Sequence, residues 1–246
     1  MSEQQGGRAP LMKLDAVHTH IEQYHILQGV DLTVPRGGVT MLLGRNGVGK
    51  TTTLKTIMGQ WTAKAGEVLY DGQDITHAPV SARARAGIGF VPEDMGIFSD
   101  LTVEENMILG ATSGALDPRR KEWLLGAFPA LGTFWNSEAG NLSGGQKQML
   151  SIARAMAEDR KLYLIDEPTK GLAPAIVSTM AQALRDLKAQ GASILLVEQN
   201  FSVAKALGDT AAVMDDGRVI WTGEMAELAQ NAELQERLMG LSMEAH

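Results

Sequence analysis

Residues 44–51 read Gly-Arg-Asn-Gly-Val-Gly-Lys-Thr and match the pattern G-x-x-x-x-G-K-[ST] at every fixed position. Glycines let backbone N–H groups close around a phosphate, and a helix that starts here adds the positive end of its dipole. The Lys50 ammonium suits the β- and γ-phosphates of a nucleotide, and the Thr51 hydroxyl suits Mg²⁺. We therefore expect ATP and Mg²⁺ as cofactors. The predicted nucleotide contacts in this loop are Gly44, Arg45, Asn46, Gly47, Val48, Gly49, Lys50, Thr51 and Thr52.

The residues on either side of the loop bear on whether it is a phosphate site or an ordinary turn. Residues 39–43, Val-Thr-Met-Leu-Leu, are typical of a short buried strand, and residues 52–58 begin a helix. The alternative is a glycine-rich turn that only joins the strand to the helix. With a strand before it and a helix after it, the loop is predicted to be a phosphate site.

A pair of carboxylates follows a second apolar segment. Residues 161–165, Lys-Leu-Tyr-Leu-Ile, are predicted to form an apolar strand that ends in Asp166 and Glu167. Asp166 is placed to hold Mg²⁺ through water, and Glu167 is placed to act as a base that orients the attacking water. An apolar strand ending in acids is common by itself, so this assignment depends on the other motifs of the chain.

Residues 141–146, Asn-Leu-Ser-Gly-Gly-Gln, supply the third motif. Ser143 and Gln146 form an S-x-x-Q capping box, which predicts a helix over 146–157. The cap accounts for the serine and the glutamine, but it does not require the two glycines between them. Those glycines leave the backbone bare at a helix N-terminus, which suits close approach to an anion.

The sequence L-S-G-G-Q is identified as the signature of the ATP-binding cassette (ABC) family, lying between the phosphate loop and the carboxylates. The resemblance covers about residues 11–239. It implies an α/β fold, a P-loop NTPase ABC cassette with a RecA-like core, an antiparallel β subdomain and an inserted helical subdomain. It also implies a head-to-tail dimer in which the signature meets ATP held by a second cassette. The signature residues implied in that contact are Ser143, Gly144, Gly145 and Gln146.

The length fits a single domain. Residues 1–10 are polar and are predicted to form a flexible N-terminal tail, residues 11–246 a single ABC ATPase domain, and residues 96–158, approximately, its helical subdomain. Further predicted elements are strands at 12–18, 29–34, 67–70 and 193–197, a hairpin turn at 216–217, and helices at 174–190 and 224–240.

Composition narrows the classes of function. The 246 residues include no cysteine and carry a formal net charge of −7, so disulfides are excluded and a nucleic-acid surface is not favoured. No apolar run approaches the ~18 residues of a membrane span, and residues 1–10 lack the apolar core of a signal peptide. We expect a cytoplasmic protein that reaches the membrane through partners. The five histidines are scattered along the sequence without metal-ligand spacing.

Four positions depart from the general pattern of the family. Glu93 stands where most cassettes have a glutamine, in a loop that the family uses to sense Mg²⁺ and the attacking water; a carboxylate can bind the metal there. Gln199 replaces the usual switch histidine, and Ala173 replaces an aspartate. The usual adenine-stacking position falls on Ile21, with the aromatic Tyr24 further along. Either Tyr24 reaches the adenine through a shifted loop or Ile21 packs on it without stacking.

The combination of V-P-E, G-L-A-P and V-E-Q-N resembles the ATP-binding subunits of branched-chain amino acid importers, a subgroup that extends to urea, amides and aromatic acids. The resemblance implies the second of two cassette subunits, at the cytoplasmic face of the inner membrane. Implied partners are a second ABC ATPase subunit (heterodimer, or alternatively homodimer), two transmembrane permease subunits and, indirectly, an extracytoplasmic solute-binding protein. The predicted catalytic residues are Glu167, Gln199 and Glu93, and the predicted metal ligands are Thr51, Glu93 and Asp166.

Two other functions are consistent with a cassette. An export-type or lipopolysaccharide-type cassette usually keeps the switch histidine, so Gln199 argues against that class. A soluble ABC ATPase of translation or DNA repair usually carries two cassettes or a long coiled-coil insertion, and the sequence has one cassette and no heptad insertion. The resemblance does not name the solute, because the cassette of such an importer never touches it.

Overall fold

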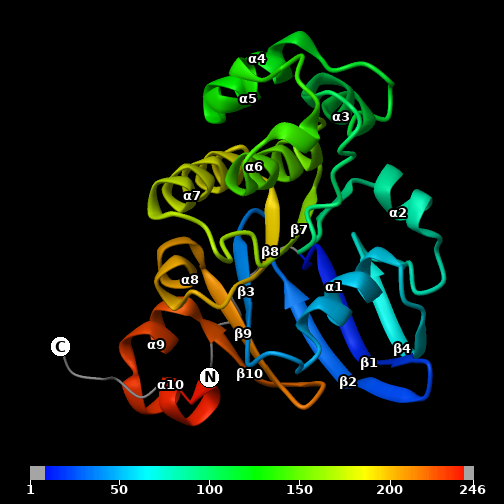
Figure 1. Ribbon diagram of the computed structural model, residues 1–246. Coiled ribbons are helices and arrows are strands. Elements are labelled where there is room, and N and C mark those ends of the chain that lie inside the picture. The colour runs from blue at the N-terminus through cyan, green and yellow to red at the C-terminus, as the bar shows by residue number, and fades with distance from the viewer. Residues whose placement is uncertain (1–8, 241–246) are drawn as a thin grey trace.

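The computed structural model describes residues 9–240, which form two β-sheets and the helices packed on them (Figure 1). Residues 1–8 of the predicted tail and residues 241–246 of the predicted domain lie outside the described part of the chain. One sheet has six strands in the order β10-β9-β3-β8-β7-β6, and the other has four strands in the order β2-β1-β4-β5. This pairing of a mostly parallel sheet with an antiparallel one agrees with the predicted α/β class.

The six-stranded sheet carries the loops that contain the motifs. Its strands are β3 (Val39–Leu43), β6 (Ile88–Val91), β7 (Leu162–Asp166), β8 (Ser193–Val197), β9 (Thr210–Asp215) and β10 (Arg218–Glu224). All of them run parallel except β10, which pairs antiparallel with β9. The turn between these two strands falls at the predicted residues 216–217. The motif loops therefore leave one edge of the sheet, where the carboxyl ends of its parallel strands meet.

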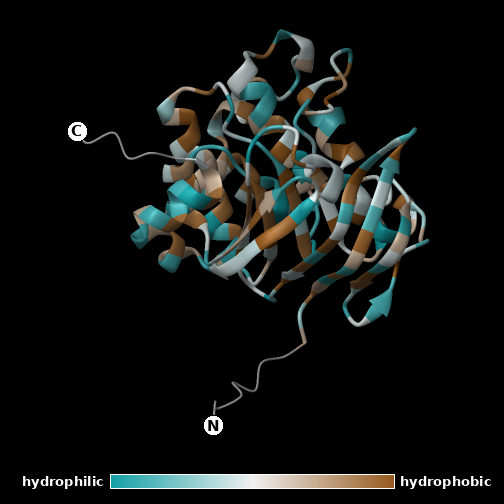
Figure 2. Ribbon diagram, turned by 90° about the horizontal axis from the view of Figure 1, so that it is seen from below, coloured by the Kyte–Doolittle hydropathy of each residue, from teal (hydrophilic) through white to brown (hydrophobic). Residues whose placement is uncertain are grey.

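The parallel strands are apolar throughout because both faces of the sheet are covered. In β8, Ile194 and Leu196 pack into one hydrophobic core, and Leu195 and Val197 into the other. Figure 2 shows the corresponding hydrophobic segments along the strands of the interior, with hydrophilic segments on the outer loops. A continuous apolar run in the sequence thus becomes a strand buried on two sides.

The four-stranded antiparallel sheet comes mainly from the first part of the chain. Its strands are β1 (Met12–Ile21), β2 (Tyr24–Val34), β4 (Ala63–Tyr70) and β5 (Gln73–Asp74). The strands predicted at 12–18, 29–34 and 67–70 are confirmed, and each is longer than the sequence pattern indicated. Register shifts interrupt the pairing of β1 with β2, which explains why strict alternation of polar and apolar residues breaks down there.

The helices fall into three groups along the chain. The first two are α1 (Lys50–Met58) and α2 (Val80–Arg85). Between β6 and β7 lie α3 (Val103–Leu109), α4 (Pro118–Ala127), α5 (Pro129–Thr133), the short 3₁₀ helix η1 (Ala139–Asn141) and α6 (Gly144–Ala155), at the top of Figure 1. The last group is α7 (Pro174–Ala189), α8 (Phe201–Leu207), α9 (Met225–Gln230) and α10 (Ala232–Met239). None of the helices within residues 9–240 is long and apolar enough to cross a membrane.

Two predicted helices show how local signals set the boundaries. The capping box at the start of α6 forms as expected, since the Ser143 hydroxyl accepts from the Gln146 N–H and the Gln146 side chain accepts from the Ser143 N–H. The helix predicted over 224–240 is instead two helices. Asn231 ends α9 and caps α10, with its side chain accepting a hydrogen bond from the N–H of Leu234 at 2.9 Å.

Candidate nucleotide site

The loop between β3 and α1 leaves a helix N-terminus bare. Gly47 and Gly49 have φ angles of 83° and 109°, a left-handed backbone that side chains other than glycine rarely adopt. Gly49 is the N-cap of α1 and has no side chain with which to make a capping hydrogen bond to the first turn. The first turn also holds no acidic residue. The positive end of the helix and its backbone N–H groups are therefore available to an anion.

Lys50 is folded back over this loop. Its Nζ donates hydrogen bonds to the carbonyl oxygens of Gly44 and Arg45, each at 2.9 Å. Burial lowers the pKa of Lys50, while Glu167 and Asp166 act in the opposite direction. The ammonium is thus held by backbone oxygens of the loop that the motif predicts to bind phosphate.

A cavity of about 410 Å³ opens beside the loop, and it is lined by much of the phosphate loop together with the three predicted catalytic residues. Its lining residues are Ile26, Asn46, Gly47, Gly49, Lys50, Thr51, Thr52, Glu93, Glu167, Lys170 and Gln199. Gly44 and Arg45 line a neighbouring cavity together with Asn46 and Gln199. Val48 turns its side chain to the core below the loop. The cavity is built from loops that follow four different strands, which explains why sequence spacing alone does not reveal it.

Glu167 and Gln199 meet in this cavity. The Gln199 amide Nε2 donates a hydrogen bond of 2.6 Å to Oε2 of Glu167. Glu167 has a φ of 46°, uncommon for a residue with a side chain, and its N–H donates to the carbonyl oxygen of Val197 at 3.0 Å. The last residue of β8 therefore fixes the backbone of Glu167, and the loop after β8 fixes its carboxylate. Backbone strain at such a residue is consistent with a functional constraint.

Asp166 has the surroundings of a metal ligand. Both carboxylate oxygens are buried and make no hydrogen bond to any described residue. Burial raises the pKa of Asp166 to about 6, against the lowering effect of the nearby Thr51 hydroxyl. Thr51, Glu93 and Asp166, the three predicted metal ligands, line one cavity of about 420 Å³. Orphaned buried carboxylate oxygens beside a hydroxyl fit a hard cation such as Mg²⁺.

The described residues contain no group of three histidine, cysteine or acidic side chains arranged to hold a metal unaided. Mg²⁺ is usually held by one or two carboxylates together with substrate phosphates and water.

The signature residues do not line the nucleotide cavity. Gly145 packs against α7, where a Cβ would come within 2.2 Å of the Cδ1 of Ile176. A Cβ on Gly144 would meet nothing within 4 Å. Packing among the described residues thus accounts for one glycine of the pair and does not account for the other.

The two residues considered for the adenine, Tyr24 and Ile21, lie outside the lining of this cavity. Tyr24 is 61% exposed at the start of β2, and neither Tyr24 nor Ile21 lines the cavity. Ile26, two residues after Tyr24, forms part of its wall instead. The adenine role of Tyr24 therefore stays a prediction. Sequence reasoning missed Ile26 because a register shift between β1 and β2 changes which side chains face inward.

Lys170 is the second residue that sequence reasoning missed. It lines the cavity, and its ammonium contacts two of the predicted catalytic carboxylates. A sequence signal was present, because Lys170 lies in the short loop after β7 and three positions after Glu167. The departure from the family pattern in the same loop falls on Ala173 and does not single out the lysine.

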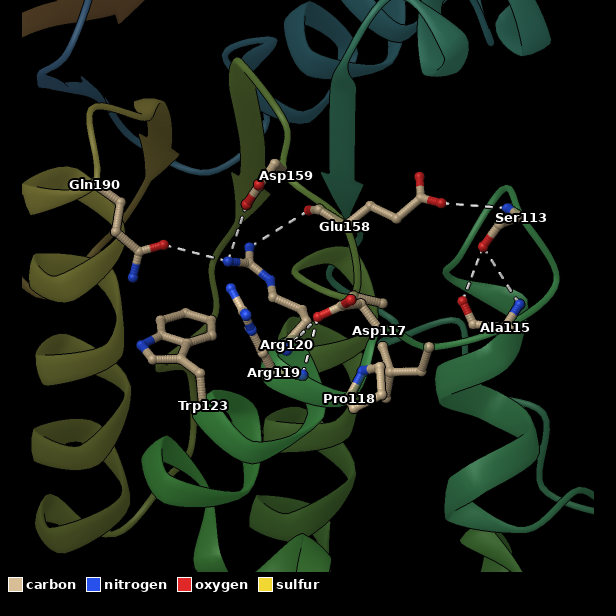
Figure 3. Close-up of a pocket in the computed structure, with 12 residues that line it drawn as sticks. Ser113, Ala115, Asp117, Pro118, Arg119, Arg120, Trp123, Glu158, Asp159 and Gln190 are labelled. Carbon is tan, nitrogen blue, oxygen red and sulfur yellow. Dashed lines mark hydrogen bonds and ion pairs between the residues drawn. The ribbon is translucent and has the colours of Figure 1, made fainter.

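A larger cavity of about 700 Å³ lies between α4 and the loop after α6, and it contains none of the predicted site residues (Figure 3). Its central side chain, Arg120, bonds the Asp159 carboxylate at 3.0 Å and the Gln190 side chain at 3.2 Å. The guanidinium also lies 4.5 Å from the centre of the Trp123 ring. These contacts satisfy the charge of Arg120. We therefore interpret Arg120 as a residue that links α4 to the core rather than as one that binds a ligand.

The fold and the site together define a class. A glycine loop running into a helix N-terminus, with an acidic pair at the end of a neighbouring parallel strand, is the arrangement of a P-loop nucleotide-binding cassette. The comparison with known families agrees, because the ABC transporter family matches residues 27–170. The chain belongs to the ABC transporter family, whose ATP-binding subunits hydrolyse ATP to drive transport.

Individual relatives match over nearly the full length. The chain is 35% identical to the high-affinity branched-chain amino acid transport ATP-binding protein BraG of Pseudomonas aeruginosa, covering 94% of this chain and 100% of the relative. It is 35% identical to a probable branched-chain amino acid transport ATP-binding protein, LivF, of Archaeoglobus fulgidus, covering 89% and 94%. The lipopolysaccharide export protein LptB of Escherichia coli is 32% identical, covering 87% and 91%.

Solved structures confirm the predicted fold class. The ATP-binding subunit of an ABC transporter superposes with a TM-score of 0.79 at 29% identity, covering 95% of this chain and 96% of that chain. An ATP-binding cassette of an ABC transporter in its ADP conformation gives the same TM-score at 25% identity, covering 94% and 97%. Proteins that share this fold thus include ATP-binding cassettes, one of them solved in its ADP conformation.

Proposed function

We propose that this chain is the ATP-hydrolysing subunit of an ABC importer for branched-chain amino acids or related small polar solutes such as urea, amides or aromatic acids. The observation that carries the proposal is the cavity where the phosphate loop, Glu93, Glu167 and Gln199 converge. The identity to BraG and LivF over nearly the whole chain supports the choice of solute class.

The residues have separate tasks in this proposal. Backbone N–H groups of the phosphate loop and the start of α1 bind the phosphates, and Lys50 leaves the loop carbonyls to contact them. Thr51, Glu93 and Asp166 hold Mg²⁺, which when bound neutralises phosphate charge. Glu167 accepts a proton from the attacking water, or orients it.

Gln199 keeps Glu167 in place through the hydrogen bond between their side chains. Ser143, Gly144, Gly145 and Gln146 complete the site of a second cassette, which is a different chain or a second copy of this one. Two transmembrane permease subunits bring the pair to the cytoplasmic face of the inner membrane. A solute-binding protein on the outer side delivers the solute to them.

The experiment is to express the chain with its candidate permease and cassette partners, isolate the assembly, and measure ATP turnover in liposomes. We expect turnover to rise with a loaded branched-chain amino acid receptor, and Lys50→Ala to lose nucleotide affinity and hydrolysis together. Turnover unchanged in Lys50→Ala would remove the loop from the mechanism. Co-purification with lipopolysaccharide-export membrane subunits would favour the LptB-like alternative.

A further inference from the structure

The ammonium of Lys170 joins two acidic side chains that belong to different loops. Its Nζ lies 2.7 Å from Oε1 of Glu93 and 3.5 Å from Oε2 of Glu167. Glu93 follows β6 and Glu167 follows β7, two neighbouring strands of the sheet. The same Oε2 of Glu167 also accepts the hydrogen bond from Gln199. Lys170 is therefore in direct contact with the predicted hydrolysis machinery.

The backbone that carries Lys170 is anchored by hydrogen bonds, while its side chain is more than half exposed. The hydroxyl of Thr169 donates to the buried carboxylate of Glu198 at 2.8 Å, and the Lys170 N–H donates to the carbonyl oxygen of Glu167 at 3.3 Å. The Lys170 side chain is 57% exposed. A flexible four-carbon stem on a fixed loop lets the ammonium move without a change of the fold.

Without Lys170, negatively charged side chains around the cavity would outweigh the positively charged ones. Glu93, Asp166 and Glu167 are acidic. Lys50 is occupied by the loop carbonyls, and Lys55 lies in the neighbouring cavity that Glu93 shares with Asp166. Metal-free ATP is a polyanion, so these carboxylates repel it. A cation among them reduces that repulsion, as a bound metal ion does.

We propose that Lys170 is a resident cation of the nucleotide site, which compensates Glu93 and Glu167 while the metal is absent and releases them when magnesium-bound nucleotide enters. Lys170 is a positioning residue in this role, since it acts through the two carboxylates. The inference rests on the proposed nucleotide site. It assigns the lysine a task that differs with and without the metal, which a purely structural ion pair does not have.

The test compares nucleotide binding with and without metal, using the fluorescent analogue mant-ATP and the purified full chain in Mg²⁺ or in EDTA. In Lys170→Met we expect the dissociation constant in EDTA to rise about tenfold, because the charges of Glu93 and Glu167 are then left uncompensated beside the bound polyanion. In Mg²⁺ it should change by no more than about twofold, because the metal supplies the charge instead. Lys170→Arg keeps the charge and should behave as the wild type does in both buffers.

A matched control is available in Lys161→Met. Lys161 is similarly exposed, at 60%, and pairs with Asp71 at 2.8 Å, but it precedes β7 and so lies at the opposite end of that strand. The Lys161→Met variant should bind mant-ATP with wild-type dissociation constants in both EDTA and Mg²⁺. Equal effects of Lys170→Met in EDTA and in Mg²⁺, or no effect in either, would overturn the inference. If Lys50→Ala binds mant-ATP as tightly as the wild type does, the nucleotide site itself is overturned, and the inference with it.

Discussion

The Gln199 amide and the Glu167 carboxylate are joined by a hydrogen bond of 2.6 Å. The two residues follow neighbouring parallel strands, β8 and β7, and are far apart in the sequence. A histidine at position 199 could donate to a γ-phosphate and could titrate near neutral pH. The glutamine amide donates and accepts hydrogen bonds but has no titrating proton. We therefore propose that Gln199 positions Glu167 through this hydrogen bond.

The first prediction concerns Gln199. In an assembly with a histidine-containing partner cassette, we expect Gln199→Ala to lower ATP turnover by about tenfold or less, because it removes a positioning hydrogen bond and no transition-state charge. Alanine at the switch histidine of the partner cassette should cost more, and Gln199→His should be tolerated or activating. Steady-state ATPase and transport assays measure both. Abolished transport in Gln199→Ala, with activity retained in the partner's histidine variant, would contradict this prediction.

The second prediction concerns Glu167. Glu167→Gln keeps the shape of the side chain but removes the proton acceptor, so ATP turnover should fall by about 10²–10⁴-fold while ATP still binds. The variant should accumulate as an ATP-bound dimer with its partner, visible by size-exclusion chromatography. Glu67→Gln, on the exposed strand β4, is the control and should keep wild-type turnover. Intact hydrolysis without nucleotide-dependent association would count against both the base and the dimer.

The third prediction separates the two glycines of the signature. Gly145→Ala places a Cβ against Ile176 and should lower the free energy of unfolding of the isolated chain by about 1–3 kcal/mol. Gly144→Ala meets open space and should not lower the melting temperature, yet it should reduce turnover in the assembled dimer by crowding the anion of the other cassette. Thermal unfolding and ATPase assays on the same two variants are decisive. Full dimer activity in Gly144→Ala would show that this glycine faces no ligand.

The fourth prediction concerns the pH dependence of the metal-free and nucleotide-free chain. Burial raises the pKa of Asp166 from 3.8 to about 6, so the folded state resists ionisation of this carboxyl more than the unfolded state does. Its protonation therefore favours folding at acid pH. That contribution is lost as the pH rises from about 4 to about 6, and the penalty is complete at neutral pH.

Asp166→Asn removes this penalty. In EDTA at pH 7.5 we expect the variant to be more stable than the wild type by on the order of 2–3 kcal/mol at most, and the difference should shrink toward pH 4. Melting temperatures across this pH range measure the effect. The stability advantage should also decrease when Mg²⁺ and nucleotide are added, because the wild type then gains a partner for the carboxylate. A pH-independent loss of stability in Asp166→Asn would show that the carboxylate is satisfied by the protein itself.

The sequence alone predicted the parts of the site that depend on short stretches of backbone. The phosphate loop, the capping box of Ser143 and the acidic end of β7 each lie within a few consecutive residues. Local backbone geometry determines a loop, a cap or a strand end, so residue types at fixed spacing are sufficient to indicate them. The parallel strands were also predictable, since their apolar runs report burial on both faces.

The tertiary structure decided which of these parts come into contact. The spacing of residues in the sequence does not predict those contacts. The bond between Gln199 and Glu167 and the bridge from Lys170 to Glu93 depend on the strand order β8-β7-β6. Ile26 lines the cavity because of a register shift between β1 and β2, which no local sequence pattern predicts.

Three histidines that are scattered in the sequence also come together. Nδ1 of His18 lies 3.0 Å from Nε2 of His25, and the rings of His20 and His25 stack 4.2 Å apart. They meet because β1 and β2 pair antiparallel, with His20 directly opposite His25. Spacing along the chain fixes contacts within one element, whereas contacts between elements follow from strand order and register, which are set by the burial of the whole sheet.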